Sequence, residues 1–297
     1  MSAGAVLITG AGGQLGSDLN DQLSGSRQAF PLEHAQLDIS DDSAVARAFD
    51  EAQPSLVFNC AAFHNVELCE TEEDRSFEVN AYAVKRLAVR CAETGAKLVH
   101  LSTNYVFDGA RPEPYSEEDL PNPRSIYAIS KLAGEYAARA YAPEALVVRT
   151  AGLYGLHGSA SKGGNFVTRM IARAKEQGNL KMVADQRLSP TYTADLARAL
   201  IEAVDASCSG VLHLTNGGAC TWHEFTVEIM RLAGIDVPVE PVETVTPTGG
   251  ADRPLNGVLG RTRAEEAGLT PLRSWQEALS DYMHAAGLIQ SAAGQPS

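Results

Sequence analysis

Tyr127 and Lys131 stand four residues apart in the segment NPRSIYAISKLAGEYAARAYA, which has a helical pattern. That spacing places the phenol and the amine on one face of a helix. The pair suits carbonyl reduction, because a hydride leaves negative charge on the carbonyl oxygen and a nearby acid must supply a proton. A lysine ammonium close to a phenol favours the phenolate and lowers the barrier of the reverse reaction. Alone the pair is weak evidence, since chance produces it in roughly one sequence in five of this composition.

A second polar group, STNYVFDG at positions 102–109, follows the apolar run KLVHL. Hydroxyl groups at the end of a buried strand could hold a polar ligand, although a plain turn at Asp108-Gly109 would have a similar composition. Parallel strands and their following helices meet at one carboxyl edge of a sheet. We therefore expect Thr103 to be a third hydroxyl directed at the carbonyl oxygen, with Asn104 and Tyr105 on the substrate side.

A glycine-rich turn near the start predicts a dinucleotide site. In AVLITGAGGQLGSDLNDQL, Gly10, Gly13 and Gly16 follow an apolar run and precede a helical pattern. The first glycine permits a tight turn, the second lets the backbone approach a pyrophosphate, and the third lets the helix pack closely. Free N–H groups at the helix N-terminus would bind the phosphates. A glycine motif of this kind is also compatible with a flexible turn, but its place in a strand-turn-helix order favours the cofactor.

Other residues of the first half are expected to contact the cofactor. Glu33 lies near the usual offset for an acid on the ribose 2′-hydroxyl, which would favour NAD over NADP. Asp38 and Ile39 could lie beside the adenine ring. The small residues of NCAA, which include Ala61 and Ala62, end the next apolar run and would let a flat ring or a ribose lie against the backbone.

The order of elements predicts the fold. The apolar runs AVLIT, LVFN, KLVHLS and ALVVRT alternate with longer helical patterns, which is typical of a parallel sheet with helices on both faces. We expect an α/β fold, a doubly wound parallel sheet (Rossmann) with a smaller C-terminal α/β substrate-binding region. The expected parts are an NAD(P)-binding domain at 1–150 with a return crossing at about 186–215, a substrate-binding region at 151–185 and 216–289, and a flexible tail at 290–297.

Composition excludes several classes of protein. A net charge of −13 makes broad binding of nucleic acid or of an anionic membrane surface unfavourable. The cysteines are scattered and odd in number, which argues against a disulfide framework, and no set of histidines has the spacing of a metal site. No run approaches the roughly 18 apolar residues of a membrane span. We expect a cytoplasmic protein that binds neither nucleic acid nor membrane.

These motifs resemble the extended short-chain dehydrogenase/reductases, and within them the dTDP-4-dehydrorhamnose reductase group. The likeness covers nearly the whole chain. The segments that carry it are TGAGGQLG, NCAAFHNVELCE, EVNA, HLSTNYVFDG, YAISKLAGE, VVRTAGLYG, GGNFV, ADQRLSPTYTADLA and DRPLNGVL. GQLG, STxYVFDG and the SPT segment together are much more specific than the general dehydrogenase motifs.

The resemblance implies roles for individual residues. It implies that Thr103, Tyr127 and Lys131 form the catalytic set. The residues implied to line the cofactor, NADPH or NADH, are Gly10, Gly13, Gln14, Leu15, Gly16, Asp38, Ile39, Ala62, Phe63 and His64. The residues implied to face the substrate are Asn165, Arg187 and Arg253. A guanidinium can bind phosphate oxygens through two hydrogen bonds, although each arginine could also be an ordinary surface charge.

The sequence departs from the family pattern at three positions. Asn104 stands where the family usually has Asp, and Gly152 where it commonly has Trp; both are expected to face the sugar. Ala194 occupies the position of an acidic residue that bridges a metal in some dimeric relatives. We therefore expect no metal, and a monomer or a homodimer.

The expected reaction is NAD(P)H-dependent reduction of the 4-keto group of a nucleotide-linked 6-deoxyhexose. The leading substrate is dTDP-4-dehydro-L-rhamnose, which would give dTDP-L-rhamnose. One alternative keeps the fold but makes the protein an epimerase or a reductase of another nucleotide sugar. Another is a non-catalytic regulatory subunit that retains the cofactor site; the intact Thr103, Tyr127 and Lys131 argue against it.

Overall fold

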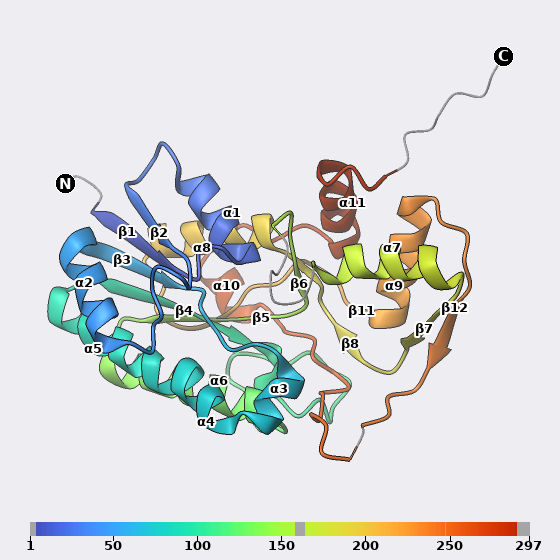
Figure 1. Cartoon of the computed structure of the whole chain (residues 1–297), viewed down its shortest axis with the longest axis horizontal. Coiled ribbons are helices and arrows are strands. Elements are labelled where there is room, and N and C mark those ends of the chain that lie inside the picture. The colour runs from blue at the N-terminus through green and yellow to red at the C-terminus, as the bar shows by residue number, and fades with distance from the viewer. Residues whose placement is uncertain (1–3, 158–163, 247, 290–297) are drawn as a thin grey trace.

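The centre of the fold is a six-stranded parallel sheet, seen in the computed structural model of Figure 1, which describes residues 4–157, 164–246 and 248–289. Its strand order is β10-β5-β4-β3-β1-β2. The strands are β1 (Ala5–Thr9), β2 (Ala29–Leu32), β3 (Pro54–Asn59), β4 (Lys97–Thr103), β5 (Leu146–Thr150) and β10 (Gly210–His213). The winding direction changes between β1 and β3, and a cofactor binds outside the carboxyl ends of the strands at such a point. The predicted fold class is confirmed.

Helices cover both faces of the sheet, as Figure 1 shows. One face packs against α1 (Gln14–Leu23) and α8 (Thr193–Asp205), and the other against α2 (Asp42–Ala52), α5 (Ala83–Thr94) and α6 (Ile126–Tyr141). Successive residues of a strand point to opposite faces. In β1, Val6 and Ile8 join the core under α1 and α8, whereas Leu7 joins the other core. Because both faces are buried, the strands read as continuous apolar runs.

The helical stretch before β4 is broken into four pieces. These are α3 (Val66–Thr71), α4 (Glu73–Phe77), a π-helical turn η1 (Glu78–Tyr82) and α5. Asn80 of η1 accepts a hydrogen bond from the Phe63 N–H and donates one to the Phe63 carbonyl oxygen, each at 2.9 Å. Its amide also donates to the Ser130 hydroxyl on α6 at 3.1 Å. The π turn thus ties the loop after β3 to α6.

The C-terminal region packs around its own aromatic core. Its helices are α7 (Phe166–Gln177), α9 (Trp222–Ala233) and α11 (Trp275–Ala285), and its short strands are β6 (Leu153–Tyr154), β7 (Leu180–Val183), β8 (Arg187–Leu188), β9 (Thr191–Tyr192), β11 (Cys220–Thr221) and β12 (Val239–Val242). Tyr154, Phe225 and Tyr282 are buried at the centre. A capping box begins α9, where Thr221 and Glu224 each bond the other's backbone N–H.

The chain crosses between the two regions differently from the expected boundaries. The return crossing starts at α8, because the preceding β8 pairs with β11 of the C-terminal region. A second crossing was not expected: Ala264 of α10 (Thr262–Glu266) and the following Leu269 and Leu272 pack in the first core. The expected tail at 290–297 lies outside the described residues. Across the described part of the chain, no helix is both long and apolar enough to cross a bilayer.

A buried ion pair joins α6 to the sheet. Arg149 of β5 contacts Glu135 of α6 at 2.7 Å, with only 4% and 2% of the two side chains exposed. The Ser102 hydroxyl of β4 also donates to Glu135, and the Arg149 guanidinium lies over the Phe107 ring. The pair therefore connects the helix of Tyr127 to the two strands beside it.

Removing one member of this pair should destabilise the fold strongly. Glu135→Gln leaves the Arg149 charge buried without its counter-charge, so the free energy of unfolding should fall by about 3–5 kcal/mol. Glu240→Gln is the control, because Glu240 pairs with Lys181 on the surface and exposed pairs contribute about 0–1 kcal/mol. Urea unfolding measures both. Equal small losses would show that the buried pair does not hold α6 in place.

Candidate active site

Thr103 and Tyr127 meet at the carboxyl end of β4. Thr103 is the last residue of that strand, and its hydroxyl oxygen accepts a hydrogen bond from the Tyr105 N–H at 3.2 Å. The Tyr127 side chain lies close enough to the Thr103 side chain to interact with it. The Tyr105 ring packs edge-on against the Tyr127 ring, with centroids 5.8 Å apart. The structure thus brings together the phenol and hydroxyl that were predicted to act on one carbonyl oxygen.

Lys131 lies one helical turn after Tyr127, and its amine is buried beneath α6. Its Nζ atom donates to the Leu101 carbonyl oxygen at 2.6 Å and lies 3.5 Å from Nε2 of His100. Burial lowers the pKa of Lys131 to about 8, against the opposing attraction of Glu135. The amine therefore titrates near neutral pH.

Burial sets the protonation state of Tyr127. It raises the pKa of the phenol above the usual value, and the nearby Thr103 side chain opposes the rise. The Lys131 amine, one turn along α6, donates to the Leu101 carbonyl oxygen, and its expected effect on the phenol stays a prediction. The phenol therefore keeps its proton, which is the state that a proton donor to a ketone requires.

The glycine turn fits a dinucleotide. Gly10 has φ +66°, and a Cβ atom there would lie 2.8 Å from the Ala61 backbone nitrogen at the end of β3. A Cβ on Gly16 would lie 2.5 Å from the Gly10 carbonyl oxygen. Helix α1 begins after Gly13 with no side-chain cap, whereas Asp41 and Ser125 cap α2 and α6. Its N-terminal N–H groups are thus left to a ligand such as a phosphate.

The other predicted cofactor residues lie around this turn or after β3. The side-chain oxygen of Gln14 is buried without a partner in the first turn of α1, and Leu15 is buried beside it. Glu33, exposed at the end of β2, has its carboxyl carbon 3.0 Å from where a Cβ on Gly12 would be. The remaining predicted residues are Asp38, Ile39, Ala61, Ala62, Phe63 and His64. An unfilled acceptor, a close backbone turn and an uncapped helix together suit a nucleotide with a pyrophosphate.

Asp38 and Ile39 follow β2 in a tight turn. The Asp38 carboxylate accepts hydrogen bonds from the N–H and the hydroxyl of Ser40, and these bonds lower its pKa. Ile39 is buried against α2. The acid is therefore charged and held in one orientation, whereas Ile39 is a core residue as well as a predicted neighbour of the adenine.

The substrate side is formed where residues 253–257 return to the catalytic strand. The Asn104 amide donates to the Gly257 carbonyl oxygen at 3.1 Å. Arg253 hydrogen-bonds the Tyr105 side chain and also pairs with Glu67 at 2.6 Å. Arg187 is exposed on β8, and its N–H donates to the Leu255 carbonyl oxygen at 2.7 Å. Arg253 thus lies in the segment 253–257 itself, and Arg187 lies on the strand that is hydrogen-bonded to this segment.

Asn165 has structural contacts of its own. Only 4% of this residue is exposed, and its side chain caps α7 by accepting from the Thr168 N–H. Its amide donates to the Gly155 carbonyl oxygen and the Tyr282 hydroxyl, at 2.7 and 2.6 Å. Its implied place on the substrate side stays a prediction. An Asn just before an amphipathic helical pattern is an N-cap signal, so the sequence could have indicated the cap.

Gly152 has φ +56° and faces the C-terminal region. A Cβ atom there would lie 2.7 Å from a Leu188 methyl group and 3.7 Å from the Trp222 ring. Trp222, at the start of α9, therefore supplies an aromatic ring beside the glycine. Sequence reasoning missed this residue, because the two positions are far apart in the chain.

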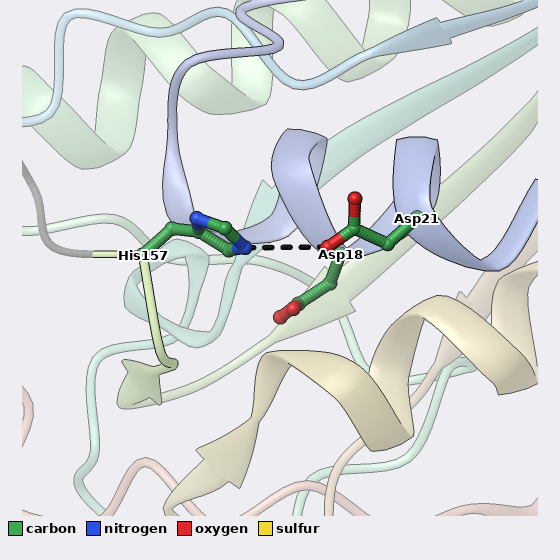
Figure 2. Close-up of side chains that lie close together, drawn as sticks. All are labelled: Asp18, Asp21 and His157. Carbon is green, nitrogen blue, oxygen red and sulfur yellow. Dashed lines mark ion pairs between the residues drawn. The ribbon is translucent and has the colours of Figure 1, made fainter. Parts of the chain in front are cut away.

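A group of possible metal ligands lies at the other end of α1. Figure 2 shows Asp18 and Asp21 of α1 facing His157, whose Nε2 atom is 3.4 Å from an Asp21 oxygen. Burial raises the pKa of Asp18, while the nearby Thr193 side chain opposes the rise. One ligand atom from each residue lies within 4.8 Å of the others, and exposed acids often gather without an ion. The expectation that no metal is needed stays a prediction.

Comparison with known proteins identifies the family. The family model described as "RmlD substrate binding domain" matches residues 4–287. A dTDP-4-dehydrorhamnose reductase of Mycobacterium tuberculosis is 41% identical over 287 residues, covering 94% of this chain and 92% of the relative. A solved dTDP-4-dehydrorhamnose reductase from Clostridium acetobutylicum is 41% identical, with TM-score 0.90 over 95% of this chain and 99% of that one.

A second solved structure bears on the cofactor. It is the dTDP-4-dehydrorhamnose reductase of Bacillus anthracis in complex with NADP, 37% identical, with TM-score 0.89 over 96% of this chain and 99% of that one. The match covers the glycine turn, the Thr103–Tyr127–Lys131 group and the C-terminal region alike. The chain belongs to the RmlD family of dTDP-4-dehydrorhamnose reductases.

Proposed function

We propose that this protein is an NADPH- or NADH-dependent reductase that converts dTDP-4-dehydro-L-rhamnose to dTDP-L-rhamnose. The observation that carries the proposal is the meeting of the Thr103 and Tyr127 side chains beside the buried amine of Lys131. This group stands at the same edge of the sheet as the glycine turn. Relatives of similar length that bear the name dTDP-4-dehydrorhamnose reductase support the choice of sugar.

The chain's own residues divide the work of the reaction. Gly10, Gly13 and the first N–H groups of α1 would hold the pyrophosphate of the cofactor, which when bound supplies the hydride. Tyr127 gives its proton to the 4-keto oxygen as charge develops there, and Thr103 donates a hydrogen bond to the same atom. Lys131 would then stabilise the phenolate that remains on Tyr127 after the proton has been transferred, because an ammonium near a phenol favours its anion.

The substrate would lie between β4 and the returning C-terminal segment. Arg253 is held beside Tyr105 by a hydrogen bond, and Arg187 is exposed on the adjoining layer, so both suit the diphosphate of a nucleotide sugar. Asn104 is tied to Gly257 and offers a neutral amide where the family usually has a carboxylate. We assign cofactor binding to the sheet region and sugar binding to the C-terminal region.

The cellular setting is also part of the proposal. The five free cysteines suit a reducing compartment, so we place the enzyme in the cytoplasm. We infer a monomer or a homodimer with a nucleotide sugar as its partner molecule. The net charge of −13 disfavours nucleic acid as a partner.

Tyr127→Phe should remove most turnover. Losing the phenolic proton is expected to lower kcat by about 100-fold or more, since general acids contribute about 10²–10⁴-fold. NADPH consumption at 340 nm with dTDP-4-dehydro-L-rhamnose measures the rate. Tyr136→Phe is the matched control, because Tyr136 is on the same helix with 56% of its surface exposed. Parent-level turnover in Tyr127→Phe would refute the assignment of the acid.

Gly16→Ala should weaken cofactor binding. The added methyl group would meet the Gly10 carbonyl oxygen, so the turn must shift away from its position. Overpacking of this kind costs about 1–3 kcal/mol, which corresponds to a roughly fivefold or larger rise in the Kd of NADPH. Gly260→Ala is the control, since a Cβ there has its nearest contact at 3.4 Å. Fluorescence titration with NADPH compares the two, and equal affinities would contradict the proposed cradle.

Lys131→Met should change how stability depends on pH. The folded pKa of about 8 lies below the ordinary value of 10.5, so the unfolded chain binds the proton more tightly. The charge therefore opposes folding fully below pH 8, and this cost fades as pH rises towards 10.5. The parent should therefore gain stability with rising pH, whereas the variant should not. The free energy of unfolding of the variant, relative to that of the parent, should fall by about 2 kcal/mol between pH 7 and pH 9.5. Urea unfolding at both pH values tests this, and a constant difference would show a normal lysine.

A further inference from the structure

A row of buried polar side chains runs across three neighbouring strands and ends at Lys131. Thr9 of β1 pairs in register with Asn59 of β3, which pairs with His100 of β4. The Thr9 hydroxyl lies 2.7 Å from Oδ1 of Asn59, and Nδ2 of Asn59 lies 3.1 Å from Nδ1 of His100. The other ring nitrogen of His100 lies 3.5 Å from the amine of Lys131. Each link of the row is within hydrogen-bonding reach.

The row interrupts an otherwise apolar face. Two residues earlier in the same strands, on the same side of the sheet, the layer is Leu7, Val57 and Leu98, all buried in the core with α5 and α6. At the carboxyl edge this layer becomes Thr9, Asn59 and His100, also fully buried. Burying polar groups is unfavourable unless each finds a partner, so packing alone would favour more leucine and valine here.

The approach of α6 places the imidazole against the amine. A Cβ atom on Gly134 would overlap the Asn80 carbonyl oxygen and lie 3.3 Å from Nε2 of His100. Glycine at this position therefore lets the helix come close to the sheet. The Lys131 amine then meets two groups fixed on β4, the Leu101 carbonyl oxygen and the His100 ring. Of the three ammonium protons, one is left to point elsewhere.

The row has two complete hydrogen-bond arrangements. With a charged Lys131, Nε2 of His100 accepts, Nδ1 carries the proton, and the Asn59 amide presents its oxygen to Nδ1 and its NH2 group to Thr9. With a neutral Lys131, Nε2–H donates to the amine, and the amide takes the opposite orientation. This second orientation is the one in the structure, where the Thr9 hydroxyl donates to Oδ1 of Asn59 and the Asn59 NH2 group faces Nδ1 of His100. Ring tautomer and amide orientation are both free to follow the charge. Burial keeps the imidazole neutral, because it lowers the pKa of His100 well below the usual value.

We propose that His100 is a positioning residue of the reductase, which orients the Lys131 amine and favours its charged form through the row Thr9–Asn59–His100. This rests on the role of Lys131 in the proposed function. The imidazole supplies the charged amine with a second acceptor and holds its remaining proton towards the reaction side. The other titratable groups that face Lys131 are Glu135 on its own helix and Cys60 after β3, whose backbone N–H donates to the Thr9 carbonyl oxygen.

Two substitutions test the two ring nitrogens of His100 separately. His100→Asn retains an amide near the position of Nδ1, so it keeps the contact with Asn59 but leaves Lys131 without its second acceptor. His100→Gln retains an amide near the position of Nε2, so it keeps the contact with Lys131 instead. Each His100 variant is prepared once with Lys131 and once with Lys131→Met. The difference in the free energy of unfolding between these two proteins is measured from pH 7 to pH 9.5. That difference reports the pKa of Lys131 with no cofactor or substrate present.

The expected result is a shift in one variant only. A hydrogen bond to the charged form favours that form, so His100→Asn should move the titration of Lys131 downward by about 0.5–1 pH unit. His100→Gln should leave it within about 0.3 unit of the parent. In the 340 nm assay, the fall of kcat at alkaline pH should shift in the same direction in His100→Asn, with kcat lowered about tenfold or more and KM changed less than about threefold.

The outcomes distinguish the two proposals. Equal behaviour of the Asn and Gln variants, or an unmoved titration in His100→Asn, overturns the role of His100. If His100→Asn does not fold, His100→Leu replaces it, since leucine fits the apolar layer below and equally removes the acceptor. If the parent does not reduce dTDP-4-dehydro-L-rhamnose while the titration of Lys131 still shifts in His100→Asn, the proposed function is refuted. The role of His100 in orienting Lys131 is then still supported.

Discussion

The close approach of α6 to β4 is the constraint on which the site depends. Gly134 removes the side chain that would keep the helix away from Asn80, and the Lys131 amine then reaches the Leu101 carbonyl oxygen. Because Tyr127 is one turn earlier on the same helix, this approach also sets the phenol beside Thr103. A helix resting a few tenths of an ångström further out would separate all of these contacts together. The catalytic geometry is thus a property of one helix–strand interface.

Electrostatics at this interface oppose stability in one place and support it in another. The Lys131 amine is charged at neutral pH only against a desolvation cost, which its lowered pKa expresses. The ion pair of Glu135 and Arg149, one turn further along α6, joins the helix to β5 and keeps its charges balanced. A buried ion pair adds little net stability compared with apolar residues. It does, however, strongly disfavour any packing of the helix on the strands that would leave one of its charges unpaired. We interpret the pair as the device that fixes the helix in the position that the costly amine needs.

The sequence predicted most of what depends on local pattern. Strand and helix alternation and the glycine turn are signals within short segments, and both are present in the structure. The placement of Thr103 beside Tyr127 followed from a topological rule, since parallel strands share a carboxyl edge. These inferences needed no knowledge of distant contacts.

What the sequence could not indicate depends on long-range partners. The π turn at Glu78–Tyr82 has the same apolar spacing as an ordinary helix, and only its bonds to Phe63 and Ser130 reveal it. The amine of Lys131 was expected to act on the phenol directly, but its acceptors on β4 are invisible to spacing along α6. Asn165 differs, because its position just before a helix is a local cap signal that the sequence does contain, while its implied role towards the substrate stays a prediction.

The link between Asn104 and Gly257 shows why the two regions work as one. A C-terminal segment crosses back to the catalytic strand, so the residue beside Thr103 is held by a carbonyl oxygen from the sugar-binding side. A carboxylate at position 104 could not donate that bond and would repel the oxygen instead. The neutral amide therefore makes the position of the catalytic threonine depend on residues 253–257, which also carry Arg253 to Tyr105.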